Sequence, residues 1–220
     1  EVTTHGELEA AYSDRTAMLF LFGDASERGE ITVQEMAASG RAHGVPSIVD
    51  AAAEQPNVPN WYLQQGVDAV AYSGGKCMRG PQASGLVLGR KELLRAAFAN
   101  GSPHGSIGRP MKAGKEEIMG LLAAVEQWVL RDHKAELREW DRRLQVIADT
   151  VSAFDSVTIS IRTPRPSNVA PHMTIRWDEK RLGMSPAEAK QQLSRGEPRI
   201  EISGGKNGLT INPYMMEEGE

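Results

Sequence analysis

Short apolar runs alternate with amphipathic helical segments over residues 7–113, and this alternation constrains the fold more than any other feature. Thr16–Phe22 is a continuous apolar run, as expected for a strand that is covered on both faces. Thr32 and Glu35 have the spacing of a capping box at the start of a helix. We therefore predict an α/β layer with a mostly parallel sheet. Further strands are expected at 46–49, 68–72 and 86–88, and further helices at 59–65 and 91–99.

From residue 113 the pattern changes to a long amphipathic helix followed by alternating strands. Apolar side chains from Ile118 to Ile147 recur every three or four positions, which predicts one long helix or two abutting helices to about Val151. The period then becomes two, which is typical of an antiparallel sheet with one wet face. Strands are expected at 157–161, 173–177, 200–202 and 209–211, a helix from Ser185-Pro186, and a stiff loop at 163–167. We expect two domains, residues 1–112 and a smaller α/β domain at 113–220.

Polar residues close two neighbouring strands of the predicted parallel sheet. Asp50 ends one apolar run, and Ser73-Gly74-Gly75-Lys76 follows the next. Ligands of open parallel sheets sit beyond the carboxyl ends of the strands, so both segments are candidate site residues. A lysine amine can form a Schiff base with an aldehyde, and a carboxylate can keep a pyridine nitrogen protonated. A hydroxyl and glycine amides suit a phosphate, so the set resembles a pyridoxal-phosphate anchor of the aspartate-aminotransferase fold.

These residues also have simpler interpretations. Asp50 could cap a helix, and Lys76 could be an ordinary surface lysine, although two polar segments at adjacent strand ends favour a site. A nucleotide phosphate loop is excluded, because Val70 stands six positions before Lys76 and Cys77 takes the place of the magnesium-binding hydroxyl.

Arg109 and Lys112 lie near the expected junction of the two domains. An arginine provides a bidentate fork for a carboxylate or phosphate, and a lysine provides a point charge. We therefore expect these two residues to contact an anionic substrate. Two solvated cations before a helix are the alternative.

Composition narrows the classes of partner. The net charge is −4, so no global basic field recruits nucleic acid, and we do not expect nucleic acid or a membrane as a partner. Cys77 is the only cysteine, which fits a reducing, cytoplasmic location. We expect no metal ion. The chain begins at Glu1 without Met, so we expect it to be a fragment.

Four motifs resemble the selenocysteine-synthase-like family of fold-type-I pyridoxal-phosphate enzymes. They are Val49-Asp50-Ala-Ala-Ala-Glu54, Gly66-Val-Asp-Ala-Val-Ala-Tyr-Ser73-Gly-Gly-Lys76, Arg79-Gly-Pro-Gln82 and Gly108-Arg-Pro-Met-Lys112. The family includes L-seryl-tRNA selenium transferases and D-glucosaminate-6-phosphate ammonia-lyases. The chain resembles the lyase branch more closely, because the transferases usually carry Asp at the position of Gly75. The resemblance implies that residues 1–112 are the C-terminal part of the large cofactor-binding domain.

The resemblance also implies roles. Lys76 would form the Schiff base with pyridoxal 5'-phosphate, Asp50 would pair with the pyridine nitrogen, and Ser73, with the amide of Gly75, would help hold the phosphate. Arg109 and Lys112 would face a small anionic amino-acid or amino-sugar-acid substrate. The implied reaction is the elimination of water and ammonia, and the implied assembly is a homodimer or a higher homo-oligomer.

Two other functions stay open at this point. One is selenium or sulfur transfer to seryl-tRNA, which the acidic net charge disfavours. The other is a non-catalytic role for a truncated half-domain.

Overall fold

The computed structural model describes residues 1–26, 28–162 and 169–219. The chain divides into two compact units, Glu1–Arg131 and Asp132–Glu220. Each unit has its own four-stranded sheet. The expected loop at 163–167 lies outside the described residues.

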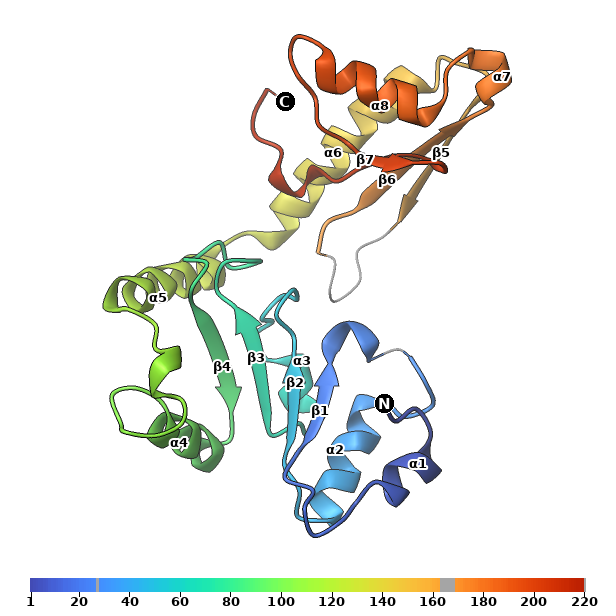
Figure 1. Cartoon of the computed structure of the whole chain (residues 1–220). Helices are drawn as coiled ribbons and strands as arrows, with labels where there is room; N and C mark the ends of the chain where they lie inside the picture. Colours follow the sequence, from blue (N-terminus) through green and yellow to red (C-terminus); the bar gives the residue numbers. More distant parts are fainter. Residues whose placement is uncertain (27, 163–168, 220) are drawn as a thin grey trace. The chain divides into compact units, whose positions relative to one another are not determined.

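A four-stranded sheet forms the centre of the first unit, with the strand order β1-β2-β3-β4. β1, β2 and β3 are parallel, and β4 runs antiparallel to β3, as the arrows in Figure 1 show. The predicted mostly parallel sheet is therefore confirmed. The strands are β1 (Leu19–Phe22), β2 (Ser47–Asp50), β3 (Ala69–Ser73) and β4 (Gly85–Gly89).

Helices of this unit begin where their sequences provide caps. At the start of α2, Thr32 Oγ1 accepts the Glu35 N–H at 3.2 Å, and Glu35 Oε2 accepts the Thr32 N–H at 2.9 Å. The predicted capping box is thus present. The helices are α1 (His5–Ala10), α2 (Val33–Ala42), α3 (Trp61–Gln64), α4 (Lys91–Asn100) and α5 (Lys115–Leu130), with 3₁₀ turns η1 (Gly23–Ala25) and η2 (Arg109–Met111).

The strand register decides which side chains share a face of the sheet. Val49 and Val70 are paired and fully buried. Asp50 belongs to the other face, in a row that pairs Phe22 with Asp50, Asp50 with Ala71, and Ala71 with Val87. Phe22 and Val87 are exposed at the ends of this row. The register therefore places the Asp50 carboxylate between apolar neighbours on the less covered face.

Helix α5 packs against the rest of the first unit. The indole N–H of Trp128 donates to the Pro56 carbonyl at 3.0 Å, and the indole is buried. Gly120 faces Pro81 so closely that a Cβ there would lie 2.6 Å from the proline Cγ. The compact units consequently divide after α5, between Arg131 and Asp132, whereas the sequence-based division at 112/113 falls before this helix.

The second unit packs one long helix against an antiparallel sheet with the strand order β5-β6-β8-β7. Its buried core contains Leu144 and Ala148 from the helix and Met173 and Ile175 from the sheet. The strands predicted at 157–161, 173–177 and 209–211 are confirmed. The elements are α6 (His133–Val151), β5 (Val157–Arg162), β6 (His172–Trp177), α7 (Glu179–Leu182), α8 (Pro186–Arg195), β7 (Ser203–Gly205), β8 (Gly208–Ile211) and η3 (Pro213–Met215).

One strand prediction in this unit is wrong. Residues 200–202 are not in a strand, and the strand begins at Ser203. The N–H of Ile200 donates instead to the Leu193 carbonyl near the end of α8, at 2.9 Å. This bond occupies the N–H of Ile200, which is therefore not available to a neighbouring strand.

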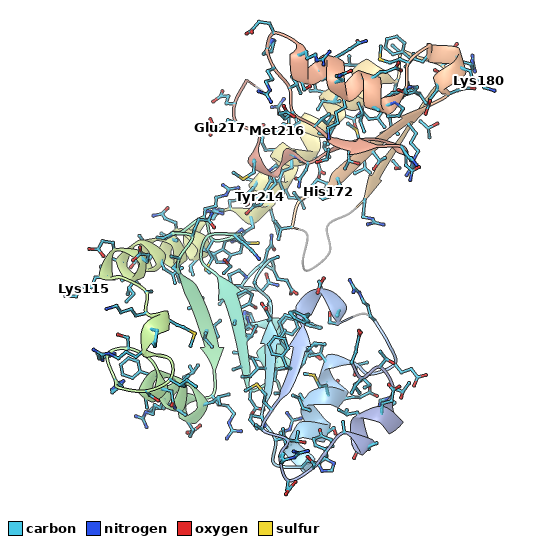
Figure 2. The ribbon with its side chains drawn as sticks, viewed as in Figure 1. Lys115, His172, Lys180, Tyr214, Met216 and Glu217 are labelled. Atoms are coloured by element: carbon cyan, nitrogen blue, oxygen red, sulfur yellow. The ribbon has the colours of Figure 1, made fainter. Side chains whose placement is uncertain are left out.

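The end of the chain folds back onto α6. The rings of Trp140 and Tyr214 lie 5.6 Å apart, and the Arg143 guanidinium donates to the carbonyl of Met216. Tyr214 and Met216 are labelled in Figure 2, beside the lower part of that helix. These contacts attach the last turn, η3, to the core of the second unit.

Candidate active site

Asp50 stands at the carboxyl end of β2 and is half-buried. Its Oδ1 accepts the N–H of Ala52 at 3.0 Å, so the side chain also shapes the turn that follows the strand. The N–H of Ala51 donates to the Ala71 carbonyl at 2.9 Å, which extends the pairing between β2 and β3 past Asp50. The carboxylate is therefore held on a fixed backbone.

Ser73 ends β3, directly beside this turn. Its N–H donates to the Ala52 carbonyl at 3.3 Å. Because β2 and β3 are parallel neighbours, their carboxyl ends lie at one edge of the sheet. The structure thus brings Asp50 and Ser73 together, as the sequence predicts.

Lys76 is carried by the tight turn that follows Ser73. The N–H of Gly74 donates to the Ser84 carbonyl at 2.9 Å, and the N–H of Gly80 donates to the Gly74 carbonyl at 2.8 Å. Inside this frame the Arg79 N–H donates to the Lys76 carbonyl at 2.9 Å, and Arg79 has a positive φ of 59°. The side chain of Lys76 is exposed. The turn therefore places an exposed lysine three residues after the end of β3.

The glycines of this turn are required by close packing. A Cβ on Gly74 would lie 2.0 Å from Ser84 Oγ, and one on Gly75 would lie 2.5 Å from Gln82 Oε1. The Gln82 amide also donates to the Gly75 carbonyl at 3.2 Å. Side chains at these two positions would displace the loop that carries Lys76.

A buried carboxylate lies behind the Asp50 turn, and the sequence did not single it out as a site residue. Glu54 is 5% exposed and accepts hydrogen bonds from the Tyr62 hydroxyl at 2.9 and 2.8 Å. Burial raises the pKa of Glu54, and the charges of Asp24 and Asp50 raise it further. Burial and the hydrogen bond to Glu54 also raise the pKa of Tyr62. Glu54 lies four residues after Asp50, and this position was the sequence signal for it. A glutamate is ordinarily expected at the surface, so its burial could not be predicted from polarity.

Arg109 and Lys112 belong to the 3₁₀ turn η2 and its cap, and not to the strand ends that carry Asp50 and Ser73. Arg109 begins η2, is exposed, and donates to the carbonyls of Pro103 and His104. Lys112 caps the same turn and is also exposed. The substrate role expected of these two exposed cations stays a prediction.

The donor set at the strand ends fits a pyridoxal-type cofactor. A half-buried carboxylate can pair with a protonated ring nitrogen, an exposed amine can bond an aldehyde carbon, and a hydroxyl can donate to a phosphate. Cys77, beside the lysine, is buried, and its thiol donates to the Ala53 carbonyl at 3.2 Å, so it serves the packing of the turn. In the parts of the chain that the structure describes, no group of three or more metal-ligating side chains is assembled.

Comparison with known proteins identifies the family. The profile of the aminotransferase class-V family matches residues 2–112, which include Asp50 and Lys76. The chain belongs to the aminotransferase class-V family. This class-V chain contains both strand-end segments of the candidate site within the matched region.

Curated relatives extend the similarity beyond that region. The class-V chain is 30% identical to the D-glucosaminate-6-phosphate ammonia lyase of Salmonella typhimurium, over 100% of this chain and 58% of that protein. It is 31% identical to a 5'-C-glycyluridine monooxygenase-decarboxylase of a Streptomyces species, over 99% of this chain and 55% of that protein. The L-seryl-tRNA(Sec) selenium transferase of Proteus mirabilis is 32% identical, over 44% of this chain and 22% of that protein. The chain therefore spans somewhat over half the length of the first two relatives.

A solved structure confirms the fold. The structure of D-glucosaminate-6-phosphate ammonia-lyase matches with a TM-score of 0.76 and 27% identity, covering 100% of this chain and 58% of that one. The predicted resemblance to the lyases and selenium transferases is confirmed, as is the two-part α/β fold.

Proposed function

We propose that this chain is the cofactor-anchoring part of a pyridoxal-phosphate-dependent lyase. The observation that carries the proposal is the meeting of Asp50, Ser73 and the Lys76 turn at the adjacent carboxyl ends of β2 and β3. Similarity along the whole chain to an ammonia lyase supports the reaction class.

Each residue of the cluster has a defined task in this proposal. Lys76 holds the cofactor through its amine, Asp50 keeps the ring nitrogen protonated, and Ser73 donates to the phosphate beside the amide of Gly75. When bound, pyridoxal 5'-phosphate supplies an electron sink for charge that develops at the substrate α-carbon. The amine of Lys76 would also be the general base that removes the α-proton of the substrate.

The proposed substrate is a small anionic amino acid or amino-sugar acid, similar to D-glucosaminate 6-phosphate. Its β-hydroxyl leaves as water, and hydrolysis of the resulting enamine takes up one water and releases ammonia and a 2-keto acid. Arg109 and Lys112 would bind its anionic group, since an exposed guanidinium and ammonium suit a carboxylate or phosphate. Alanine substitution of either residue should then raise KM more than it lowers kcat.

The cofactor assignment is tested by covalent trapping. Incubation with pyridoxal 5'-phosphate followed by borohydride reduction should attach the cofactor to the peptide that contains Lys76. The Lys76→Ala variant should lose this label and the visible absorbance of the bound cofactor, whereas Lys91→Ala, an exposed lysine on α4, should keep both. A label that survives Lys76→Ala would refute the assignment.

The reaction class is tested by product analysis. With D-glucosaminate 6-phosphate as the probe, release of ammonia and a 2-keto acid supports the lyase. Release of carbon dioxide from an amino acid would instead support a decarboxylase, to which the Streptomyces relative points. Loss of both activities together with failure to bind the cofactor would support a non-catalytic role.

Selenium transfer is the second candidate, because several bacterial selenium transferases match part of the chain. Their matches cover between 30% and 54% of it. The net charge of −4 does not favour binding of tRNA. A gel shift with seryl-tRNA distinguishes this candidate from the lyase.

We also propose a homodimer or higher homo-oligomer in the cytoplasm. The single cysteine supports a reducing compartment, and light scattering and cell fractionation test the two statements. Across the described residues, the structure contains no helix with the length and apolar character that membrane crossing requires.

A further inference from the structure

Helix α3 joins the two strand ends of the candidate site through side-chain hydrogen bonds. Its N-cap, Asn60, donates from Nδ2 to the hydroxyl of Tyr72 at 2.7 Å, and Tyr72 precedes Ser73 on β3. From the helix itself, Tyr62 donates its hydroxyl to the carboxyl oxygens of Glu54 at 2.9 and 2.8 Å. The helix therefore bonds to β3 on one side and to the segment that follows β2 on the other.

Residues 51–54 extend these bonds to the turn that follows β3. The carbonyl of Ala52 accepts the Ser73 N–H at 3.3 Å, and the carbonyl of Ala53 accepts the Cys77 thiol at 3.2 Å. Hydrogen bonds thus form a closed ring, from β3 through α3 and the segment after β2 and back to the turn after β3. Movement of residues 51–54 would consequently move that turn as well.

The bond between Tyr62 and Glu54 is the buried part of this ring. Tyr62 is 2% exposed and Glu54 is 5% exposed. Gly23, directly after β1, packs against both side chains, since a Cβ there would lie 1.9 Å from Glu54 Oε1 and 2.6 Å from the Tyr62 hydroxyl oxygen. Within 51–54 the other three residues are alanines, so Glu54 has the side chain that can form a hydrogen bond. The Tyr62 hydroxyl therefore fixes the segment from its buried side.

We propose that Tyr62 is a positioning residue of the candidate site, which acts through Glu54 to hold residues 51–54 and, through them, the turn that carries Lys76. The part that concerns a cofactor rests on the proposed function. Without the Tyr62 hydroxyl, the contacts between residues 51–54 and the turn open more often. Asp50 and Lys76 then no longer keep the fixed spacing that a ligand bound to both requires.

Cys77 provides a test that needs no cofactor, because it is the only cysteine of the chain and is 6% exposed. An aromatic disulfide reagent forms a mixed disulfide with this thiolate when the turn opens, and a coloured thiolate is released. Tyr62→Phe removes the hydroxyl that donates to the buried Glu54 carboxyl, so the labelling rate of Cys77 should rise at least about fivefold. An unchanged rate would overturn the proposal.

The urea dependence of labelling separates positioning from a general loss of stability. An opening that is limited to the turn exposes little surface, so its rate depends only weakly on urea. In Tyr62→Phe without urea, labelling of Cys77 should then be faster than global unfolding allows, as judged from the free energy of unfolding in urea. A labelling rate that simply follows the global free energy of unfolding would overturn the proposal.

Two further variants serve as controls. Tyr12→Phe removes a tyrosine hydroxyl that pairs with Ser39 on α2 at 2.9 Å, and it should leave the labelling rate of Cys77 unchanged. Glu54→Gln keeps an oxygen that accepts the Tyr62 hydroxyl, so it should retain most of the protection. An equal increase in Tyr12→Phe, or an increase in Glu54→Gln as large as in Tyr62→Phe, would overturn the assignment to this hydrogen bond.

Cofactor binding gives a second measurement. Titration with pyridoxal 5'-phosphate, followed by visible absorbance, should give a dissociation constant roughly two- to tenfold higher for Tyr62→Phe than for the wild type. Borohydride trapping should still label Lys76 in the variant, because the amine is retained. Equal dissociation constants would overturn the proposal. Absence of any binding to the wild type, with the difference in Cys77 labelling present, would instead refute the proposed function alone.

Discussion

The absence of a side chain at Gly75 lets the turn that carries Lys76 pack closely against Gln82. A methyl group there would lie 2.5 Å from Gln82 Oε1 and 2.7 Å from the Gln82 Cα, so the backbone must move. We expect Gly75→Ala to lower the free energy of unfolding by about 1–3 kcal/mol and to slow borohydride-trapped labelling of Lys76. Urea denaturation and mass spectrometry measure the two effects. Gly105→Ala, where an added Cβ meets no atom within 4 Å, should change neither.

Glu54 gives a residue-scale prediction about pH. Its pKa is raised above the ordinary value of 4.5. Between pH 4.5 and the raised pKa, the folded chain therefore keeps a proton that the unfolded chain has lost. Stability must then fall as pH rises from 4.5 through the raised pKa, because the native state binds more protons there. Glu54→Gln cannot ionise, so its free energy of unfolding should decline less over this window and exceed that of the wild type at neutral pH. Parallel pH profiles of the two chains would contradict the prediction.

The capping box of Thr32 and Glu35 stabilises the first turn of α2. Thr32→Ala removes the hydroxyl that accepts the Glu35 N–H and leaves a donor of the first turn without its cap. We expect a loss of about 1 kcal/mol in the free energy of unfolding, together with faster hydrogen exchange at the start of the helix. Gln34→Ala, an exposed position on the same turn, should not be destabilising. Equal exchange rates in the two variants would argue against the cap as the stabilising feature.

Two separate cores lead to a prediction for the whole molecule. Leu144 is fully buried in the core of the second unit, so Leu144→Ala should cost about 2–5 kcal/mol. Because each compact unit has its own core, the loss of hydrogen-exchange protection should appear in peptides from 132–219 before those from 1–131. Leu137→Ala, a more exposed position on α6, should have a smaller effect. A uniform loss of protection across both units would show that they unfold as one.

Hydrophobic periodicity, together with polar residues at the ends of apolar runs, was sufficient to predict most helices and strands and part of the candidate site. The apolar runs, the Thr32 cap and the period-two strands are local patterns, and local sterics and hydrogen bonding specify them. The parallel strand order also follows from the β-α alternation, which is why the adjacency of Asp50 and Ser73 could be inferred. The failed strand at 200–202 shows the limit, since a bond from Ile200 to the end of α8 outweighs its alternating pattern.

By itself, the sequence determined that this chain is an α/β protein with a carboxylate and a lysine closing neighbouring strands. That α5 belongs to the first unit follows from tertiary contacts, because the Trp128 indole donates to the Pro56 carbonyl and Gly120 packs against Pro81. Only the tertiary structure buried Glu54 as well. Local sequence alone predicts a charged, solvated glutamate at this position. Glu54 becomes a buried acid with a raised pKa because Gly23 and Tyr62, from other segments of the chain, pack around it.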